Sequence, residues 1–158
     1  MKFRNDRPIG KFFEAFEVGQ KMVTRGRTIT ESDIVQFGAL TGDFNPMHFD
    51  DDYMQEHMLG KRVAHGMLTL SYAVGQAFQL GFMEQTVLSF RGLEMKFSIP
   101  IFIGDTVHVE LEVTETKPAA RLGGGLVTLD VRIINQERKA VQKGSWTVLM
   151  ASKDQAED

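Results

Sequence analysis

The sequence contains no cysteine, and its formal net charge at pH 7 is −3. Without cysteine there is no disulfide framework, no thiolate catalyst and no cysteine-ligated zinc. A cysteine-free chain fits a reducing compartment, and we expect a cytoplasmic protein. The acidic balance argues against a nucleic acid as partner, because proteins that bind nucleic acids usually carry a basic face. Residues 1–19 are interrupted by charge and lack the apolar run of a signal peptide.

Residues 63–83 contain no Lys, Arg, Asp or Glu. The stretch is long enough to cross a bilayer as a helix. However, it includes His65, Thr69, Gln76 and several glycines, and it lacks interface anchors on both sides. We therefore expect no membrane span. A helix that is apolar nearly all round in a soluble protein is enclosed by other structure, which predicts a central buried helix.

Three helical segments are predicted in the first half of the chain. Thr30 and Asp33 resemble a capping box ahead of apolar residues at helical spacing, and Gly42 can end this helix in the left-handed conformation. Residues 50–59 indicate a second short helix with aspartates at its N-terminal end, where the helix dipole favours negative charge. The long uncharged helix is expected to begin near His65 and Gly66.

The pattern changes from helical to alternating after Gln85. Apolar and polar residues alternate in segments 93–99, 106–114 and 126–134, which is typical of strands with one buried and one solvated face. A last strand is expected around residues 145–150 and an earlier one at residues 21–29. The predicted order is a strand, then the helices, then four antiparallel strands in succession.

The strands need an apolar partner, and the uncharged helix needs a cover. A sheet that curls around the helix satisfies both requirements, so we predict an α+β protein with the hot-dog fold. At 158 residues, the chain fits a single domain that spans residues 1–158. We expect the core to cover about residues 12–150 and residues 151–158 to form a polar tail.

Residues 41–52 read TGDFNPMHFDDD and admit three interpretations. A calcium loop of the EF-hand type needs a glycine at its sixth position and a glutamate at its twelfth, but counting from Asp43 these are His48 and Met54. His48 and His57 lack the spacing of a zinc-binding HExxH motif, so no metal site is expected. A second, purely structural interpretation is a set of turn formers followed by a polar core histidine.

The third interpretation is an acid-base site. Asn45-Pro46 forces an extended or turn conformation, which can bring Asp43 and His48 to one side of a compact loop. The apolar helix follows soon after, and a helix N-terminus presents free backbone N–H groups. A carboxylate, an imidazole and an oxyanion-binding helix end together suit acid-base chemistry next to a carbonyl group.

Two motifs in this region resemble those of a known family. FGALTGDFNPMHFDDDY, followed by RVAHGML, is similar to the signature of MaoC-like, (R)-specific enoyl-CoA hydratases. The segments FFEAFEVGQ and FSIPIFIGDTVHVELEV are also similar to that family, so the resemblance covers about residues 12–150. Met54 departs from the hydratase pattern, which usually has a small residue there, and this leaves the shape of the nearby pocket open.

The resemblance implies a homodimer, with a higher homo-oligomer left open, that adds water reversibly and syn across the double bond of a trans-2-enoyl-CoA. Asp43 and His48 would be the catalytic residues, which hold and activate the water and exchange a proton with the α carbon. The backbone N–H of Gly66 would bind the thioester oxygen, and Asn45 would hold the loop in place. No cofactor and no metal are implied, because the acyl-CoA thioester is itself the activated substrate.

Residues that share the helix face of Gly66 by spacing are candidates for binding the acyl chain: Leu70, Ala73, Val74 and Ala77. Packing against the sheet alone explains them equally well. His65 is expected only to start the helix. Lys61 and Arg62 are either phosphate-binding groups for CoA or solvated loop charges.

Two other functions remain open at this point. A hot-dog thioesterase would use a carboxylate-activated water to attack the carbonyl carbon. A non-catalytic acyl-CoA-binding subunit would keep the fold and have no need of a base. The presence of both Asp43 and His48 favours hydration over either alternative.

Overall fold

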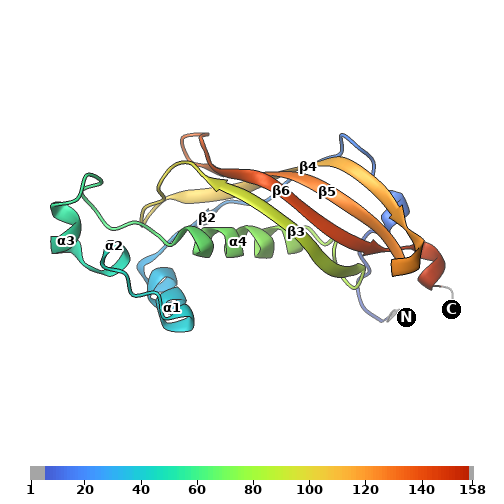
Figure 1. Ribbon diagram of the computed structural model, residues 1–158, viewed down its shortest axis with the longest axis horizontal. Coiled ribbons are helices and arrows are strands. Elements are labelled where there is room, and N and C mark those ends of the chain that lie inside the picture. The colour runs from blue at the N-terminus through green and yellow to red at the C-terminus, as the bar shows by residue number, and fades with distance from the viewer. Residues whose placement is uncertain (1–5, 157–158) are drawn as a thin grey trace.

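The computed structural model describes residues 6–156, as a curled antiparallel sheet, a long helix beneath it and a group of short helices at one end (Figure 1). The strands are β1 (Lys21–Val23), β2 (Arg27–Thr28), β3 (Val87–Phe97), β4 (Thr106–Ala119), β5 (Gly124–Asn135) and β6 (Ala140–Ala151). The helices are α1 (Glu31–Thr41), α2 (Pro46–Phe49), α3 (Asp51–Gln55) and α4 (Gly66–Phe78), with 3-10 turns at Phe13–Ala15, Ala120–Leu122 and Lys153–Ala156. Residues 1–5 and 157–158, which belong to the predicted domain and its tail, lie outside the described residues.

The strands form one sheet in the order β1-β4-β5-β6-β3, and β2 also pairs with β4. All of these pairings are antiparallel. The long strands do not simply follow one another across the sheet, because β3 lies next to β6 and not next to β4. The chain therefore crosses the sheet between β3 and β4, and β3 is left as an edge strand.

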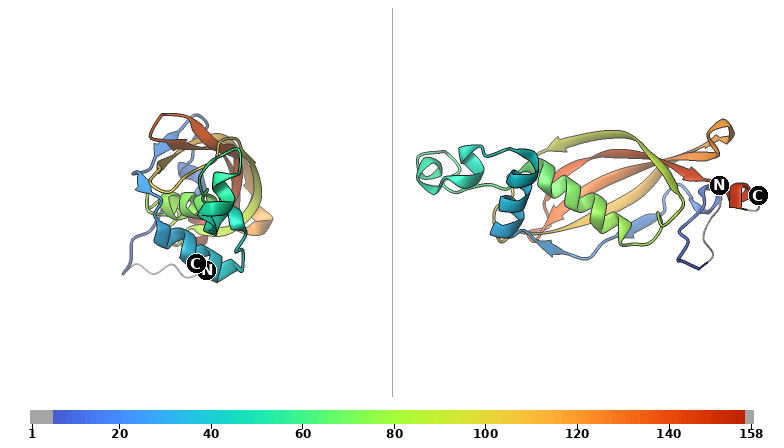
Figure 2. Two further views of the ribbon diagram at one scale, coloured as in Figure 1. Left: turned by 90° about the vertical axis from the view of Figure 1, so that its left-hand side faces the viewer. Right: turned by 90° about the horizontal axis from the view of Figure 1, so that it is seen from below.

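The sheet curves around α4, as the end-on view shows (Figure 2). Ala73 and Ala77 of α4 are fully buried against it, and their small side chains allow the helix to approach the strands closely. Burial of each Val or Leu side chain contributes about 1.5–3 kcal/mol. This arrangement confirms the predicted hot-dog fold. The buried face of β4 and β5 consists of the predicted alternating residues Val107, Val109, Leu111, Val113, Val127, Leu129, Val131 and Ile133.

The alternation in residues 93–99 is misleading about burial. Leu93 and Phe97 of β3 are 50% and 52% exposed. β3 is an edge strand with register shifts between Val87 and Ser89 and between Phe90 and Gly92, and in its second half Met95 packs against the core. The predicted burial is therefore wrong for Leu93 and Phe97, whose apolar side chains are about half exposed.

The ends of the helices are determined locally, as the sequence predicts. The Thr30 hydroxyl accepts the backbone N–H of Asp33, whose carboxylate accepts the N–H of Thr30 at 2.8 Å, so the capping box is confirmed. Gly42 ends α1 with a φ of 79°. Several boundaries differ from the prediction. α3 ends at Gln55, the strand expected at residues 21–29 is divided into β1 and β2, β3 begins at Val87 and the last strand begins at Ala140.

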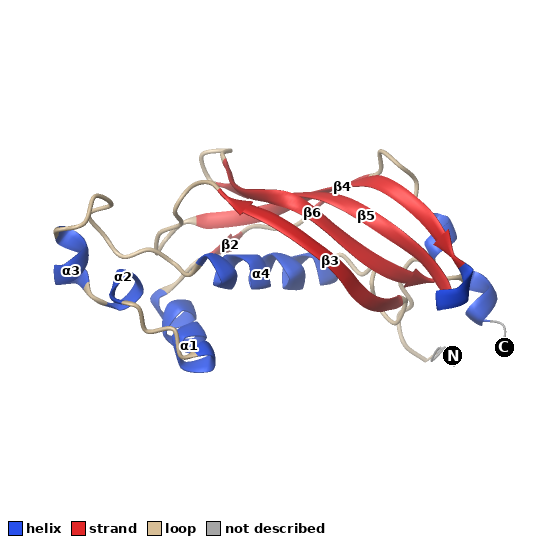
Figure 3. Ribbon diagram, in the orientation of Figure 1, coloured by secondary structure: helices blue, strands red, loops and turns tan. Residues whose placement is uncertain are grey.

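The short helices extend beyond the end of the sheet (Figure 3). α1 is tied to α4 by the hydroxyl of Tyr72, which donates to the carboxylate of Asp33 at 2.5 Å. Arg27 of β2 donates to the same carboxylate at 3.1 Å, and its guanidinium lies 3.6 Å from the centre of the Tyr72 ring. These polar contacts tie the first turn of α1 to the middle of α4. Further along α1, the ring of Phe37 lies 5.0 Å from that of His65, directly before α4, where the functional motifs lie.

The end of the described chain packs against the 3-10 turn Phe13–Ala15. Ala151 is buried in β6. Ser152 donates its hydroxyl to the carboxylate of Glu14, and the backbone N–H of Lys153 donates to it at 3.0 Å. Ala151 and Ser152 are therefore packed, unlike the polar tail predicted for them, and Lys153 is held only through its backbone. Within residues 6–156, no helix is both long and apolar enough to cross a membrane.

Candidate active site

Asp43, His48 and Gly66 come together at one pocket between α1, α2 and the start of α4. The pocket has a volume of about 340 Å³. The structure thus brings the predicted acid-base pair and the predicted oxyanion donor to one place. The lining residues are Phe37, Thr41, Asp43, His48, His65, Gly66 and Met67.

The Asn-Pro turn is held by local hydrogen bonds. The carboxylate of Asp43 accepts the backbone N–H of Asn45 at 3.3 Å. The side-chain oxygen of Asn45 in turn accepts the N–H of Met47 at 3.1 Å, which caps α2, and Pro46 occupies the first turn of that helix. The chain reverses between α1 and α2, so that Asp43 and His48 face each other across the turn.

His48 is held in a defined tautomer. Its side chain is 8% exposed, and Nδ1 lies 2.7 Å from the backbone oxygen of Val63. Since a carbonyl oxygen can only accept, Nδ1 carries the hydrogen, and in the neutral ring Nε2 carries the lone pair. Burial lowers the pKa of His48 and nearby His65 lowers it further, while the bond to Val63 and the Asp43 charge oppose these effects. His48 therefore presents an unprotonated nitrogen to the pocket.

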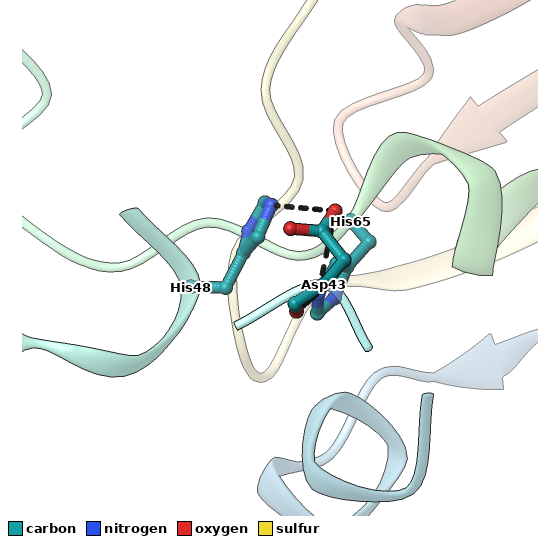
Figure 4. Close-up of side chains that lie close together, drawn as sticks. All are labelled: Asp43, His48 and His65. Carbon is teal, nitrogen blue, oxygen red and sulfur yellow. Dashed lines mark hydrogen bonds and ion pairs between the residues drawn. The ribbon is translucent and has the colours of Figure 1, made fainter. Parts of the chain in front are cut away.

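The Asp43 carboxylate lies in front of this nitrogen (Figure 4). Its Oδ2 is 4.0 Å from Nε2 of His48, and the side chain is 51% exposed. At this separation the two groups do not form a direct hydrogen bond, but one water at about 2.8 Å can contact both. The pair is thus arranged to hold a water between an acceptor nitrogen and an acceptor oxygen.

Gly66 is the first residue of α4, so its N–H group has no partner within the helix. Its backbone oxygen accepts the side-chain N–H of Gln142 from β6 at 2.9 Å, which fixes the peptide at the helix start. A Cβ at this position would lie 2.8 Å from the ring of Phe97. Glycine therefore allows the ring of Phe97 to lie against the helix start.

The other predicted substrate-binding residues lie elsewhere. Leu70, Ala73 and Ala77 are buried in the core against the sheet, and Val74 is partly exposed on the outward face of α4. None of these four lines the pocket at Gly66, and their contact with an acyl chain stays a prediction. Met54, the departure from the hydratase pattern, is fully buried in α3 and also does not line the pocket.

Sequence reasoning missed the part of His65 in this site. It was expected only to start α4, but its ring is buried and stacks on that of His48 with 3.7 Å between ring centres. Phe37, Thr41 and Met67 were missed as lining residues. Phe37 and Thr41 are one helical turn apart in α1, and the HGM sequence lies at the start of α4. These signals indicate a shared pocket only once the two helices are known to meet.

The guanidinium of Arg62 forms ion pairs with two acidic side chains. Its guanidinium donates to both carboxylate oxygens of Glu31 at 2.8 Å and to Asp51 at 2.7 Å. It also donates to the backbone oxygen of His48 at 3.3 Å. Arg62 is therefore not a solvated loop charge, because it joins α1, α2 and α3. Its contact with a CoA phosphate stays an untested alternative. Lys61 lies 4.1 Å from the centre of the Phe102 ring.

Asp43, His48 and His65 form the one group of metal-ligating side chains among residues 6–156 whose ligand atoms lie within 4.8 Å of one another. The two imidazole rings are stacked at an interplanar angle of 28°, so their in-plane lone pairs do not converge on one point. Nε2 of His65 is also occupied, since it lies 2.9 Å from the backbone oxygen of Asp43. The arrangement suits a bound water better than a tetrahedral ion.

A larger groove of about 810 Å³ runs along α4 beside the β1–β2 connection. It is lined by Arg25, Arg27 and Gln76 among others and contains none of the acid-base residues. Size alone would favour this groove as the site. We assign the chemistry to the smaller pocket, because Asp43, His48 and the helix N-terminus meet there.

A curled sheet around one helix, with an acid-base pair at the helix N-terminus, defines a hot-dog protein with a polar site. The model of the MaoC like domain matches residues 13–134. The chain therefore belongs to the MaoC-like family.

Three known proteins illustrate the similarity. The chain is 32% identical over 145 residues to the (R)-specific enoyl-CoA hydratase of Rhodospirillum rubrum, covering 90% of this chain and 93% of that protein. It is 37% identical over 105 residues to protein MaoC of Klebsiella aerogenes, a match that covers 66% of this chain but only 31% of that longer protein. The structure of R-hydratase PhaJ1 from Pseudomonas aeruginosa superposes with a TM-score of 0.77 at 30% identity, covering 89% of this chain and 86% of that one.

Proposed function

We propose that this protein hydrates trans-2-enoyl-CoA thioesters to (R)-3-hydroxyacyl-CoA, or catalyses the reverse dehydration. The observation that carries the proposal is the position of Nε2 of His48, which carries a lone pair and lies 4.0 Å from the Asp43 carboxylate. Both groups line one pocket with the N-terminus of α4. Membership of the MaoC-like family and similarity to (R)-specific enoyl-CoA hydratases support the choice of substrate.

In the hydration direction, His48 acts as the base. Nε2 takes a proton from the bound water while the water oxygen forms a bond to the β carbon. The electrons of the double bond move to the thioester oxygen, where the N–H of Gly66 and the helix dipole stabilise the enolate. The enolate then takes the proton from the His48 imidazolium at the α carbon. One O–H bond is broken, and the new C–O and C–H bonds form on the same face.

Asp43 orients the water in this mechanism. Its carboxylate accepts a hydrogen bond from the O–H group of the water that does not react. Its negative charge stabilises the positive charge that develops on His48. Asn45 acts through the turn and not on the substrate, because its N–H and side chain bond to Asp43 and Met47. General acid-base catalysis contributes about 10²–10⁴ in rate, and one oxyanion donor about 10²–10³. The steps use the protein's own groups and the thioester, with neither cofactor nor metal.

We also propose that the active form is a homodimer. Met67, Val74 and Phe78 are exposed on one face of α4, and Leu93 and Phe97 are exposed on the edge strand β3. Such an apolar surface beside an unpaired strand edge is typical of an interface between protein chains. A second copy would bury these side chains and continue the sheet.

Leu93→Glu should weaken this dimer. Light scattering is expected to give a mass of twice 17.8 kDa for the unmodified protein and a shift toward 17.8 kDa for the variant. Val23→Glu, which changes an exposed valine in β1, serves as the matched control and should leave the mass unchanged. A monomeric unmodified protein would contradict the proposed dimer.

The cytoplasmic location expected from the sequence stays a prediction.

The experiment that tests the proposed function follows the absorbance of the conjugated enoyl thioester when the protein is mixed with crotonyl-CoA and with longer and branched enoyl-CoAs. A thiol reagent measures free CoA in parallel. Loss of absorbance without CoA release, with the (R)-3-hydroxyacyl product, supports hydration. CoA release would indicate a thioesterase instead. No reaction with any of these substrates would contradict the proposed function and leave an acyl-CoA-binding role.

A further inference from the structure

His65 makes contacts that a residue needed only to start a helix would not make. It occupies the N-cap position of α4 but forms no side-chain cap. Its ring is 2% exposed, and Nε2 donates to the backbone oxygen of Asp43 at 2.9 Å. The side chain therefore connects the start of α4 to the turn that carries Asp43.

The same ring also packs on His48. The centres of the two imidazole rings are 3.7 Å apart, and their planes are inclined by 28°. Phe37 and Phe49 enclose the other sides of His65, with ring centres at 5.0 and 5.8 Å. One buried side chain thus touches both members of the acid-base pair, one through a hydrogen bond and the other through ring stacking.

We propose that His65 is a positioning residue, which holds the backbone of Asp43 and the ring plane of His48 so that both groups contact the same water. This inference rests on the proposed function, since it assigns His65 a part in the same reaction. The consequence is geometric: without His65 the His48 ring can tilt and the turn at Asp43 can shift. A displacement of about 1 Å in a catalytic group can reduce the rate about 10²-fold.

His65 has a second influence, on the protonation of His48. Nε2 of His65 donates to a carbonyl, and its buried Nδ1 has no hydrogen-bond partner among the described residues. The charged and titratable groups that face His48 are Asp43, His65 and Arg62, the last through the backbone oxygen of His48. His65 lowers the pKa of His48, whereas Asp43 raises it. Replacing His65 with a group that cannot bind a proton should therefore raise the pKa of His48.

Two substitutions separate the hydrogen bond from the ring. His65→Phe keeps an aromatic ring against His48 but removes the donor to Asp43. His65→Gln removes the ring, while its side-chain amide can replace Nε2 as the donor to the Asp43 backbone oxygen. His108→Gln changes a histidine on β4 that does not line the pocket and serves as the matched control.

Steady-state kinetics with crotonyl-CoA give the first result. We expect His65→Phe to lower kcat about 10²-fold with little change in KM, and to move the acid limb of the kcat/KM profile to higher pH. His65→Gln should recover part of kcat, and His108→Gln should behave like the unmodified protein. Wild-type kcat and an unchanged pH profile in both His65 variants would overturn the proposal.

The second result does not depend on activity. The chain has four histidines, so the titration of each imidazole can be followed by nitrogen-15 NMR. His48 should titrate at a higher pH in His65→Phe than in the unmodified protein, and at the same pH in His108→Gln. An unchanged His48 titration would contradict the coupling. If the unmodified protein hydrates no enoyl-CoA, the proposed function fails, while the NMR titration still decides whether His65 acts on His48.

Discussion

The sheet with α4 and the segment of residues 30–65 at its end are held in place by different forces. In the sheet, β4 and β5 bury alternating aliphatic side chains against α4. In the end segment, α2 and α3 are very short, and much of their attachment is polar, through Asn45, Arg62 and His65. We expect the first region to supply most of the stability, because it buries most of the apolar core, and the second to supply the geometry of the site. Changes in the two regions should therefore separate stability from activity.

Leu129→Ala should have the largest effect on the free energy of unfolding. Leu129 is fully buried in β5, and removal of a buried leucine side chain typically costs about 2–5 kcal/mol. Because this residue lies outside the pocket, kcat per folded molecule should stay within about twofold of the unmodified value. Urea unfolding combined with active-site kinetics at 25 °C checks both parts. A large loss of kcat in fully folded protein would mean that the two regions are not separable.

Arg62→Met should reverse this pattern. Its carboxylate partners Glu31 and Asp51 are more than half exposed, so solvent screening limits the loss of stability to about 1 kcal/mol. The Arg62 side chain also contacts the backbone oxygen of His48, which helps to hold the catalytic turn. We therefore expect kcat to fall clearly, although the free energy of unfolding changes little. Hydrogen exchange should increase at residues 45–55 and stay slow in β4 and β5.

Arg132→Met is the matched control for this change. Arg132 pairs with Asp130 on the surface of β5, and its removal should alter neither stability nor hydrogen exchange measurably. Arg62→Lys should recover only part of the effect, because an ammonium group cannot replace the forked contact with Glu31. Uniform acceleration of exchange across the whole protein in Arg62→Met would contradict a local role.

The smallest expected effect is a change of the free energy of unfolding with pH, caused by protonation of His48. Burial holds the pKa of His48 below 6.5, so the folded protein binds fewer protons than the unfolded chain as the pH falls below that value. This contribution is fully present above pH 6.5 and is lost as the pH falls toward the folded pKa. Unfolding in urea between pH 5 and 7.5 should show a weaker dependence on pH in His48→Asn than in the unmodified protein.

The acid limb of the kcat/KM profile should reflect the same group, because His48 must be unprotonated to accept a proton from water. We expect this limb to lie below pH 6.5. An acid limb above pH 7 would indicate that His48 is not the base, or that its pKa is raised in the free enzyme.

The two regions also differ in what the sequence alone predicts. The alternation in β4 and β5 determines their buried faces, and Thr30 and Gly42 determine the limits of α1, because these signals depend on neighbouring residues. Asp43 and His48 could be paired across the Asn-Pro turn for the same reason. The pairing of β3 with β6, the stacking of His65 on His48 and the contacts of Arg62 connect distant parts of the chain. No local pattern contains that information.

The most direct test of the account is the rate of crotonyl-CoA hydration by Asp43→Asn and His48→Ala, measured with protein whose fold is checked by its unfolding transition. We expect each variant to lose at least about 10²-fold in kcat, and the double variant to lose little more than the worse of the two, since both groups act on one water. Folded single variants that keep the rate of the unmodified protein would show that Asp43 and His48 do not form the acid-base pair.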